Sequence, residues 1–369
     1  MVCLCCGPVT ESVGFEIPRL EFEPRRYVCT RATGPVTVDG KFDEQAWELA
    51  ARTSDFLDIE GPGRPTPVHR TSVRMLWDDN YFYVAAQMEE PHVWGTLKQR
   101  DSVIYHDNDF EVFIDPDGDN HLYYELEINT LGTEWDLMLV RPYRDGGPAI
   151  NAWDIQGLRT AVHVDGTLND PSDQDEGWSV EIAIPWSVLA QAAGRPSPPA
   201  FGDIWRVNFS RVHWRTRAVE GRYEKLTDPA TGEPLPEFNW VWSPQGLIAM
   251  HYPEMWGEVE FAPEAFTDFD SASTEHGAIT AAASLMPVYY LQKQWFEDHG
   301  SFASTLDELD VPAASLPAWN PEPGVCTTVP LPVNWSLSLE TCGNGFTARL
   351  DTPYGTATVN QDGRLERMP

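Results

Sequence analysis

The sequence predicts an all-β fold, an antiparallel β-sandwich or jelly roll, followed by a small α+β C-terminal domain. Between residues 33 and 262, about ten short segments alternate apolar and polar residues and are separated by turn residues, which is typical of sandwiches. After residue 270 the alternation gives way to the helical spacing of HGAITAAASLMPVYYLQKQWFEDHG, with short strand-like pairs behind it. A chain of 369 residues is long enough for two such domains.

Each predicted strand follows from the two-residue repeat of side chains along extended backbone. The expected strands and hairpins lie at 36–38, 71–88, 108–129, 135–140, 177–186, 204–214 and 256–261. One helical turn is expected from Asp43, and a long loop at 141–157. In the C-terminal domain Pro287 is expected to kink the predicted helix.

The hairpin predicted at 108–129, NDFEVFIDPDGDNHLYYELEIN, has one apolar and one acidic face. Asp109, Glu111, Glu125 and Glu127 share the acidic face. If the hairpin closes around residues 116–120, Glu111 lies opposite Glu125 and Asp109 lies opposite Glu127. Like charges directly opposite one another are destabilising. This face therefore needs a cation, neighbouring arginines or a polyhydroxylated ligand.

Composition argues against two classes of partner. The 25 Lys and Arg residues stand against 57 Asp and Glu residues, a net charge of −32. Nucleic acids and anionic membranes attract basic surfaces, so neither is expected as a partner, and a solvated acidic surface is the simplest explanation of the charge. No apolar run is long enough to span a membrane. Among the 15 tryptophans, four are assigned to the core: Trp77, Trp178, Trp205 and Trp256.

The N-terminus and the six cysteines bear on localisation. No basic segment is followed by an apolar segment of signal-peptide type, so localisation stays open. Cys3, Cys5 and Cys6 lack the partners of a zinc site. Cys326 and Cys342 flank a strand-like segment, and in an oxidising compartment they would close a loop worth roughly 3 kcal/mol.

Six stretches carry a resemblance to a known family: VTVDGKFDEQAW, VRMLWDDNYFYVAAQMEEP, DSVIYHDNDFEVFIDPDGD, GWSVEIAIPW, WRVNFSR and WSPQGLIAMHYPEMWGEVEF. In order and spacing they resemble a family 9 carbohydrate-binding module of standalone bacterial proteins, a DOMON-like β-sandwich that binds sugar chain ends. The resemblance covers residues 33–262, after an irregular segment 1–32. It implies an extracytoplasmic role.

The C-terminal domain, residues 265–369, has a resemblance of its own. The stretch VYYLQKQWFEDHGSFASTLDEL is similar to the globular heads of type IV pilins, without the apolar N-terminal helix that pilins use for assembly. This similarity implies a protein partner whose identity the sequence does not give.

The family resemblance also implies a sugar site. Family members hold a terminal sugar between two aromatic rings and read its hydroxyl groups with polar side chains. The first ring corresponds to Tyr105, the strand carboxylate to Glu111, and a basic position of the family to Glu127. The second ring falls at Met250, so binding is expected to be weak, on the order of 0.1–1 mM. Four rings nearby are alternatives: His251, Tyr252, Trp240 and Trp242.

Four further residues are expected around this site. Glu125 is predicted to lie beside Glu111. Arg74 and Arg206 stand on polar faces of neighbouring strands, either as part of the ligand site or as salt-bridge partners that keep the acids ionised. Trp94, in the loop EEPHVWGTL, is expected to be the most exposed ring.

The segment Asp115–Asp119 has two interpretations, a metal site or a simple turn. Its alternating Asp residues suit a hard cation such as Ca²⁺. Leu126 stands where an EF-hand would carry its distal Glu, and Pro-Asp-Gly is also ordinary turn chemistry. No cofactor is expected to be required, and structural Ca²⁺ at Asp115–Asp119 is the alternative.

The resemblance therefore predicts a non-catalytic protein that binds saccharides of the xylan or glucan type in polysaccharide breakdown. Two alternatives stay open. Paired carboxylates such as Glu111 and Glu125 would suit a glycoside hydrolase, although the sequence has no motif of other common enzymes. Met250 and His251 would suit a haem-binding redox protein of a related sandwich fold.

Overall fold

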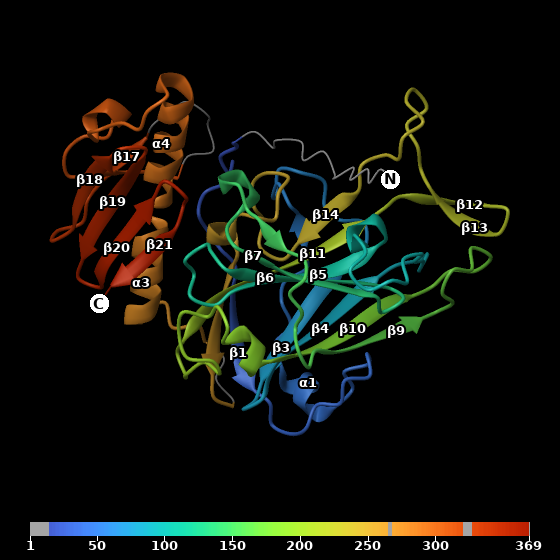
Figure 1. The fold of residues 1–369 in the computed structure, drawn as a ribbon. Coiled ribbons are helices and arrows are strands. Elements are labelled where there is room, and N and C mark those ends of the chain that lie inside the picture. The colour runs from blue at the N-terminus through green and yellow to red at the C-terminus, as the bar shows by residue number, and fades with distance from the viewer. Residues whose placement is uncertain (1–14, 265–267, 320–326, 369) are drawn as a thin grey trace, which may run out of the picture.

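The computed structural model describes residues 15–264, 268–319 and 327–368 (Figure 1). Its largest element is a sheet of 13 strands. Eleven of them follow one another in space in the order β8 (Ala149–Ile150), β7 (Glu134–Leu139), β6 (Tyr123–Asn129), β5 (Asp109–Asp115), β11 (Ile204–His213), β15 (Gly257–Ala262), β1 (Arg26–Arg31), β3 (Thr71–Trp77), β4 (Tyr81–Glu89), β10 (Gly177–Pro185) and β9 (Arg159–Asp165). β14 (Phe238–Val241) pairs with β11 and with β2 (Leu57–Asp58).

The large sheet curls so that its two halves share one core. Phe110 on β5, Val84 on β4 and Ile182 on β10 belong to the same buried apolar cluster, although several strands separate β5 from β4 in the sheet. The four tryptophans predicted to be core residues are buried. The mostly β prediction is confirmed, but the antiparallel sandwich is corrected to one curled, mixed sheet.

The parallel pairings of the sheet come from β1. This strand runs parallel to both β15 and β3 and joins the two halves of the sheet. Residues 1–32 were expected to be irregular, so β1 corrects that expectation. In RYVCTR the side chains of Tyr27 and Cys29 enter the core, an alternation too short to distinguish a strand from a loop in sequence.

The C-terminal unit consists of two helices and two small sheets. Figure 1 shows the helices between the four-stranded sheet and the large sheet. Pro287 lies in the first turn of the second helix, where its missing N–H costs no hydrogen bond, so the expected kink is replaced by a break between two helices. The elements are α3 (Thr274–Ala283), α4 (Met286–His299), β16 (Ser315–Pro317), β17 (Thr328–Pro330), β18 (Ser336–Cys342), β19 (Gly345–Thr352), β20 (Gly355–Asn360) and β21 (Leu365–Met368).

A second apolar cluster joins the C-terminal unit to the rest of the protein. It contains Val288 and Tyr289 of α4 together with Leu247, Tyr252 and Met255 from the segment before β15. Apolar packing therefore crosses the predicted boundary between residues 262 and 265. That the two parts fold independently stays a prediction. Within the described residues no helix has the length and apolar character to cross a membrane.

The remaining elements are short. They are α1 (Gln45–Leu49), α2 (Trp186–Leu189), the 3-10 turns η1 (Ile104–His106), η2 (Tyr143–Asp145), η3 (Pro253–Met255) and η4 (Asp307–Leu309), and the hairpin of β12 (Thr216–Val219) and β13 (Arg222–Lys225). Cys3, Cys5, Cys6 and Cys326 lie outside the described residues, so the predicted disulfide between Cys326 and Cys342 stays a prediction.

Candidate functional site

The predicted acidic face forms on β5 and β6, with a different register. Glu111 lies directly opposite Glu127, and Glu125 lies opposite Phe113. The predicted pairs, Glu111 with Glu125 and Asp109 with Glu127, are therefore wrong by two residues. A shift of two positions preserves the face on which each side chain lies. The acidic face itself is as predicted, and only the pairing within it is corrected.

The register changes because the hairpin loop is longer than expected. It occupies residues 116–122 rather than 116–120. The Asp115 carboxylate accepts hydrogen bonds from the backbone N–H groups of Gly118 and Asn120, both at 3.0 Å. Asn120 and Leu122 have positive φ angles of 69° and 50°, which L residues seldom adopt. These bonds hold a wide loop that turn composition alone did not reveal.

The three glutamates of this face are buried without a counter-cation. Glu111, Glu125 and Glu127 expose 6%, 6% and 2% of their surface. Burial raises the pKa of Glu111 to about 7, although the nearby Ser210 hydroxyl lowers it. Burial and mutual repulsion raise the pKa values of Glu125 and Glu127 well above normal. Across residues 15–264, 268–319 and 327–368, no Lys or Arg forms an ion pair with these glutamates.

Asp109 extends the cluster inward. It is fully buried, and carboxylate oxygens of Asp109, Glu111 and Glu127 lie within 4.8 Å of one another. Asp109 Oδ1 accepts the Val212 backbone N–H at 3.3 Å, whereas no described group hydrogen-bonds to Oδ2. Burial and the charge of Glu111 raise the pKa of Asp109. Acids this close hold protons unless a cation or hydroxyl donors face them.

Tyr105 lies at the rim of the cluster, as predicted. It belongs to η1, and its backbone N–H donates a hydrogen bond to Glu127 Oε2 at 3.0 Å. The side chain is 39% exposed. Burial of its inner part, followed by the charges of Glu127, Glu237 and Glu111, raises its pKa. The Trp135 ring lies 6.4 Å from the Tyr105 ring, centroid to centroid.

A second exposed ring, Tyr143, was missed in the sequence. It belongs to η2 within the long loop predicted at 141–157 and is 48% exposed. Partial burial and then the charges of Glu125 and Glu127 raise its pKa, and Tyr105 adds to the effect. Tyr143 packs edge-on against His251, with 4.5 Å between ring centroids. The only sign of Tyr143 in the sequence is an aromatic residue within a long loop. The spacing of residues does not show that this loop reaches the acidic face.

The arginines predicted at the site lie elsewhere. Arg74 is on β3, and β11, β15 and β1 stand between that strand and β5. Arg206 is on β11 but pairs with Asp115, whereas Ser210 of the same strand pairs with Glu111. Arg206 is buried and donates to the Pro253 carbonyl at 3.1 Å. Neither arginine neutralises Glu111 or Glu125, so the predicted salt bridges are wrong.

Two other expectations are also corrected. Trp94, expected to be exposed, is 5% exposed and packs in an apolar cluster with Val212 and Trp214. Met250 is buried in an apolar cluster with Phe113 and Tyr123, which lie on the same sheet face as the glutamates. Its carbonyl accepts the Trp256 indole N–H at 2.8 Å. Met250 therefore packs beside the glutamates and, at 8% exposure, presents little surface to a ligand.

The four rings considered as replacements for Met250 lie in different surroundings. His251 lies against Tyr143, and its Nδ1 is 2.9 Å from the Tyr123 hydroxyl. The other three, Tyr252, Trp240 and Trp242, are buried. His251 is therefore the one near the acidic face, where it supports Tyr143.

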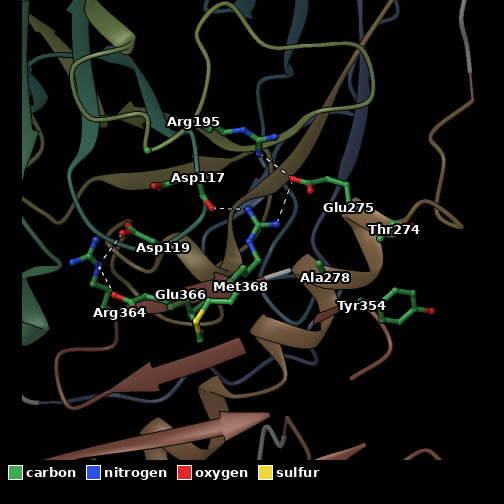
Figure 2. Close-up of a pocket in the computed structure, with 13 residues that line it drawn as sticks. Asp117, Asp119, Arg195, Thr274, Glu275, Ala278, Tyr354, Arg364, Glu366 and Met368 are labelled. Carbon is green, nitrogen blue, oxygen red and sulfur yellow. Dashed lines mark hydrogen bonds and ion pairs between the residues drawn. The ribbon is translucent and has the colours of Figure 1, made fainter. Parts of the chain in front are cut away.

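The turn Asp115–Asp119 lies at the contact with the C-terminal unit (Figure 2). Arg364 donates to Asp119 Oδ2 at 3.0 Å, and Arg367 donates to the Asp117 carbonyl oxygen at 2.8 Å. The carboxylates of Asp115, Asp117 and Asp119 approach within 4.8 Å, and Asp117 Oδ1 has no described hydrogen-bond partner. The donors suit Ca²⁺, but arginines already supply positive charge here. Calcium at this turn stays a prediction.

The acidic face therefore combines acceptors with exposed rings. Carboxylates accept hydrogen bonds from neighbouring hydroxyl groups, and tyrosine rings offer flat apolar surfaces. A sugar ring presents both features, because its edge carries hydroxyl groups and its faces carry C–H groups.

Comparison with known proteins identifies part of the chain. Residues 38–199 match the family described as "Carbohydrate family 9 binding domain-like". This part of the chain is a family 9-like carbohydrate-binding domain, and it includes Tyr105, the three glutamates and Tyr143. The match does not extend to the C-terminal unit, whose similarity to pilin heads stays a prediction.

Two curated relatives cover the same part. Exoglucanase XynX of Acetivibrio thermocellus is 25% identical over 167 residues, which is 45% of this chain and 13% of the relative. Endo-1,4-beta-xylanase A of Thermoanaerobacterium saccharolyticum is 26% identical over 167 residues, 45% of this chain and 12% of the relative. The chain thus spans a small part of the length of these relatives.

Solved structures show weaker similarity. A carbohydrate binding module family 9 from Caldicellulosiruptor kristjanssonii in complex with cellotriose has 15% identity and a TM-score of 0.41, covering 68% of this chain and 97% of that chain. A putative carbohydrate-binding protein from Bacteroides uniformis has 17% identity and a TM-score of 0.47, covering 65% of this chain and 100% of that chain.

Proposed function

We propose that this chain binds gluco- or xylo-oligosaccharides, without catalysis, at the acidic face of β5 and β6. Tyr105 and Tyr143 would stack on the sugar ring, and Glu111 would accept its hydroxyl hydrogens. The family match supports the sugar as ligand class. The names of the two curated relatives, an exoglucanase and a xylanase, support a role in polysaccharide breakdown and the choice of glucan and xylan.

One observation carries the proposal: carboxylates that are buried with no counter-cation among the described residues adjoin two exposed tyrosine rings. A protein surface seldom buries Glu without pairing it. Glu111 and Glu127 lie opposite each other, and Tyr105 is hydrogen-bonded to Glu127. A polyhydroxylated ligand supplies donors to these acceptors and apolar faces to the rings.

A second stacking ring, Tyr143, raises the expected affinity for the sugar. With Met250 in place of a second ring, binding was expected on the order of 0.1–1 mM. Because a stacked ring contributes about 1 kcal/mol, or roughly a factor of five in Kd, Tyr143 as second ring brings the expected Kd to about 20–200 μM, or about −6.4 to −5 kcal/mol. Tyr143 is thus the stacking partner that Met250 does not provide.

The proposal is tested by calorimetric titration with cello- and xylo-oligosaccharides. Tyr105→Ala and Tyr143→Ala should each weaken binding about fivefold to tenfold, since each removes one stacked ring. Tyr354→Ala is the matched control, because Tyr354 is 42% exposed on the C-terminal unit. Equal affinity in the wild type and both site variants would refute the site, and no binding of any oligosaccharide would refute the function.

The hydrolase alternative receives limited support. Glu111 and Glu127 lie side by side on one sheet face, whereas a retaining glycosidase places its two carboxylates about 5 Å apart astride the bond that is cleaved. Release of reducing ends from xylan or cellulose by the purified protein would establish hydrolysis and overturn the non-catalytic proposal.

The haem alternative depends on Met250 and His251. Met250 is buried in an apolar cluster, and His251 Nδ1 lies 2.9 Å from the Tyr123 hydroxyl. The two side chains therefore already have protein partners. A Soret band in haem-titrated protein would favour this alternative.

A further inference from the structure

The turn η2 connects the acidic face to the C-terminal unit. Its first residue, Tyr143, is an exposed ring. The ring packs on His251, whose Nδ1 lies 2.9 Å from the hydroxyl of Tyr123, two residues before Glu125 on β6. The next two residues of η2, Arg144 and Asp145, are buried and face away from solvent, with side-chain exposures of 2% and 0%. One three-residue turn thus carries a ring of the candidate site and two buried charges.

Asp145 is bound by α4. Its Oδ1 accepts hydrogen bonds from the Tyr289 hydroxyl at 2.7 Å and from Lys293 Nζ at 2.9 Å. Tyr289 and Lys293 are four residues apart on α4 and therefore lie on the same side of the helix. Both donors belong to the C-terminal unit, and their acceptor belongs to the turn that carries Tyr143.

Arg144 is enclosed by the same interface. It donates to Glu254 Oε2 at 3.0 Å, and its guanidinium lies 4.2 Å from the centre of the Tyr252 ring and 5.5 Å from the centre of the Tyr289 ring. The Tyr290 hydroxyl of α4 donates to the other oxygen of Glu254. α4 therefore contacts both residues that follow Tyr143. It bonds to Asp145 directly, and it reaches Arg144 through the Tyr289 ring and through Glu254.

This network has no role in binding a sugar directly, because its members are buried away from the acidic face. Its effect is geometric. The Tyr143 carbonyl accepts the Gly146 N–H at 2.9 Å, which closes the turn, and the charges fix the turn against α4. A stacking ring on a loop loses conformational entropy on binding unless the loop is already fixed.

We infer that the C-terminal unit is a positioning element of the sugar site, in which α4 holds η2 so that the Tyr143 ring stays against His251 at the edge of the acidic face. This inference rests on the proposed function, since it assigns the second stacking ring. It gives the C-terminal unit a task within the chain. Tyr289 and Lys293 are positioning residues, because they act through Asp145 and touch no ligand.

The first test measures the turn itself and needs no ligand. In the variant Tyr289→Phe/Lys293→Met, hydrogen exchange of the Gly146 and Gly147 amides should be at least tenfold faster than in the wild type. Exchange on β5 and β6 should be unchanged. The matched control is Tyr354→Phe/Lys41→Met, which removes a hydroxyl and an amine from exposed positions. Unchanged exchange in η2 would overturn the inference, whatever the protein binds.

The second test measures binding of cellotriose by calorimetry. The α4 double variant should lose about fivefold to tenfold in affinity, as Tyr143→Ala does. In a Tyr143→Ala background the same α4 changes should have no further effect, because the ring they position is gone. An equal loss in both backgrounds would overturn the inference in favour of a general structural effect.

Two controls separate the possible failures. Lys293→Met alone keeps the Tyr289 hydrogen bond and should give a smaller change in the same direction, which guards against a double variant that does not fold. If the wild type binds cellotriose but the α4 variants bind equally well, the inference fails and the proposed function stands. If the wild type binds no saccharide, the proposed function fails while the exchange experiment still decides how η2 is held.

Discussion

Two buried clusters of charge in this protein are built in opposite ways. At the acidic face, Glu111, Glu125 and Glu127 lie together without a described Lys or Arg partner. At the contact between η2 and α4, the buried acid Asp145 is paired with Lys293 and Arg144. The clusters are linked through one turn, since Tyr143 belongs to the first and Arg144 to the second.

The difference separates a structural cluster from the candidate ligand site. Paired buried charges satisfy each other, so the contact at η2 has a fixed geometry that changes only at high cost. Unpaired buried acids have raised pKa values and hydrogen-bonding capacity left over. The contact at η2 is complete without a ligand, and the acidic face is not. Substitutions in the two clusters should therefore change stability in opposite directions.

The largest effect is expected for Arg144→Met. Removal of this buried cation leaves Glu254 and Asp145 with less compensation and should lower the free energy of unfolding by about 3–5 kcal/mol. Urea denaturation followed by tryptophan fluorescence measures the change. Arg349→Met, which removes an exposed ion pair with Asp351, is the control and should change little. Equal small effects of both variants would show that the η2 contact adds no stability.

A smaller effect of opposite sign is expected for Glu127→Gln. The amide keeps an oxygen for the Tyr105 backbone N–H and removes an acid whose pKa is raised by burial and by its acidic neighbours. At pH 8 the free energy of unfolding should increase by about 1–3 kcal/mol, while sugar binding weakens. If this variant were less stable than the wild type, the negative charge of Glu127 would have to be neutralised by a positively charged group in the folded protein.

The last effect is spread over several pH units: the stability of the protein should depend on pH, in part through Glu111. Its pKa is raised to about 7 in the folded protein from about 4.3 in an unfolded chain. Between these values the folded protein holds a proton that the unfolded chain has released. Stability should therefore decrease as pH rises from 4.5 to 7, by at most about 1.4 kcal/mol per pH unit from this group.

Comparison of wild type with Glu111→Gln measures this contribution. Thermal unfolding at several pH values should show a shallower decrease in the variant, because the group that titrates is gone. Identical slopes in the two proteins would indicate that Glu111 titrates near its ordinary pKa, as a paired surface acid does.

Much of the candidate site could be predicted from local sequence. The alternation in residues 108–129 placed Glu111, Glu125 and Glu127 on one face, and Tyr105 was placed at the rim. The acidic face was predictable because side-chain direction in a strand depends on parity alone, whereas the position of Tyr105 came from the family resemblance. The pairing of Glu111 was not predictable in the same way, because register depends on a loop whose width is set by hydrogen bonds to Asp115.

Contacts between segments that are distant in the sequence could not be predicted from local patterns. Arg206 and Glu111 lie on polar faces of adjacent strands, yet the register of β5 with β11 brings Arg206 to Asp115 instead. Trp94 lies in a loop but is buried, since Trp214 packs on it from another part of the chain. The exposure of Trp94 depends on the residues that pack over it, and these are more than 100 positions away in the sequence.

The sequence by itself determined that the protein is mostly β with a C-terminal α+β part, which side chains share the acidic face, and the resemblance to sugar-binding modules. These features follow from periodicity and from motifs a few residues long. Only the tertiary structure decided that the sheet is mixed and curled around β1, that Tyr143 joins Tyr105 beside the glutamates, and that α4 holds the Tyr143 turn. Each of these depends on which segments meet in space, and the free energy of those contacts is absent from any local stretch of the chain.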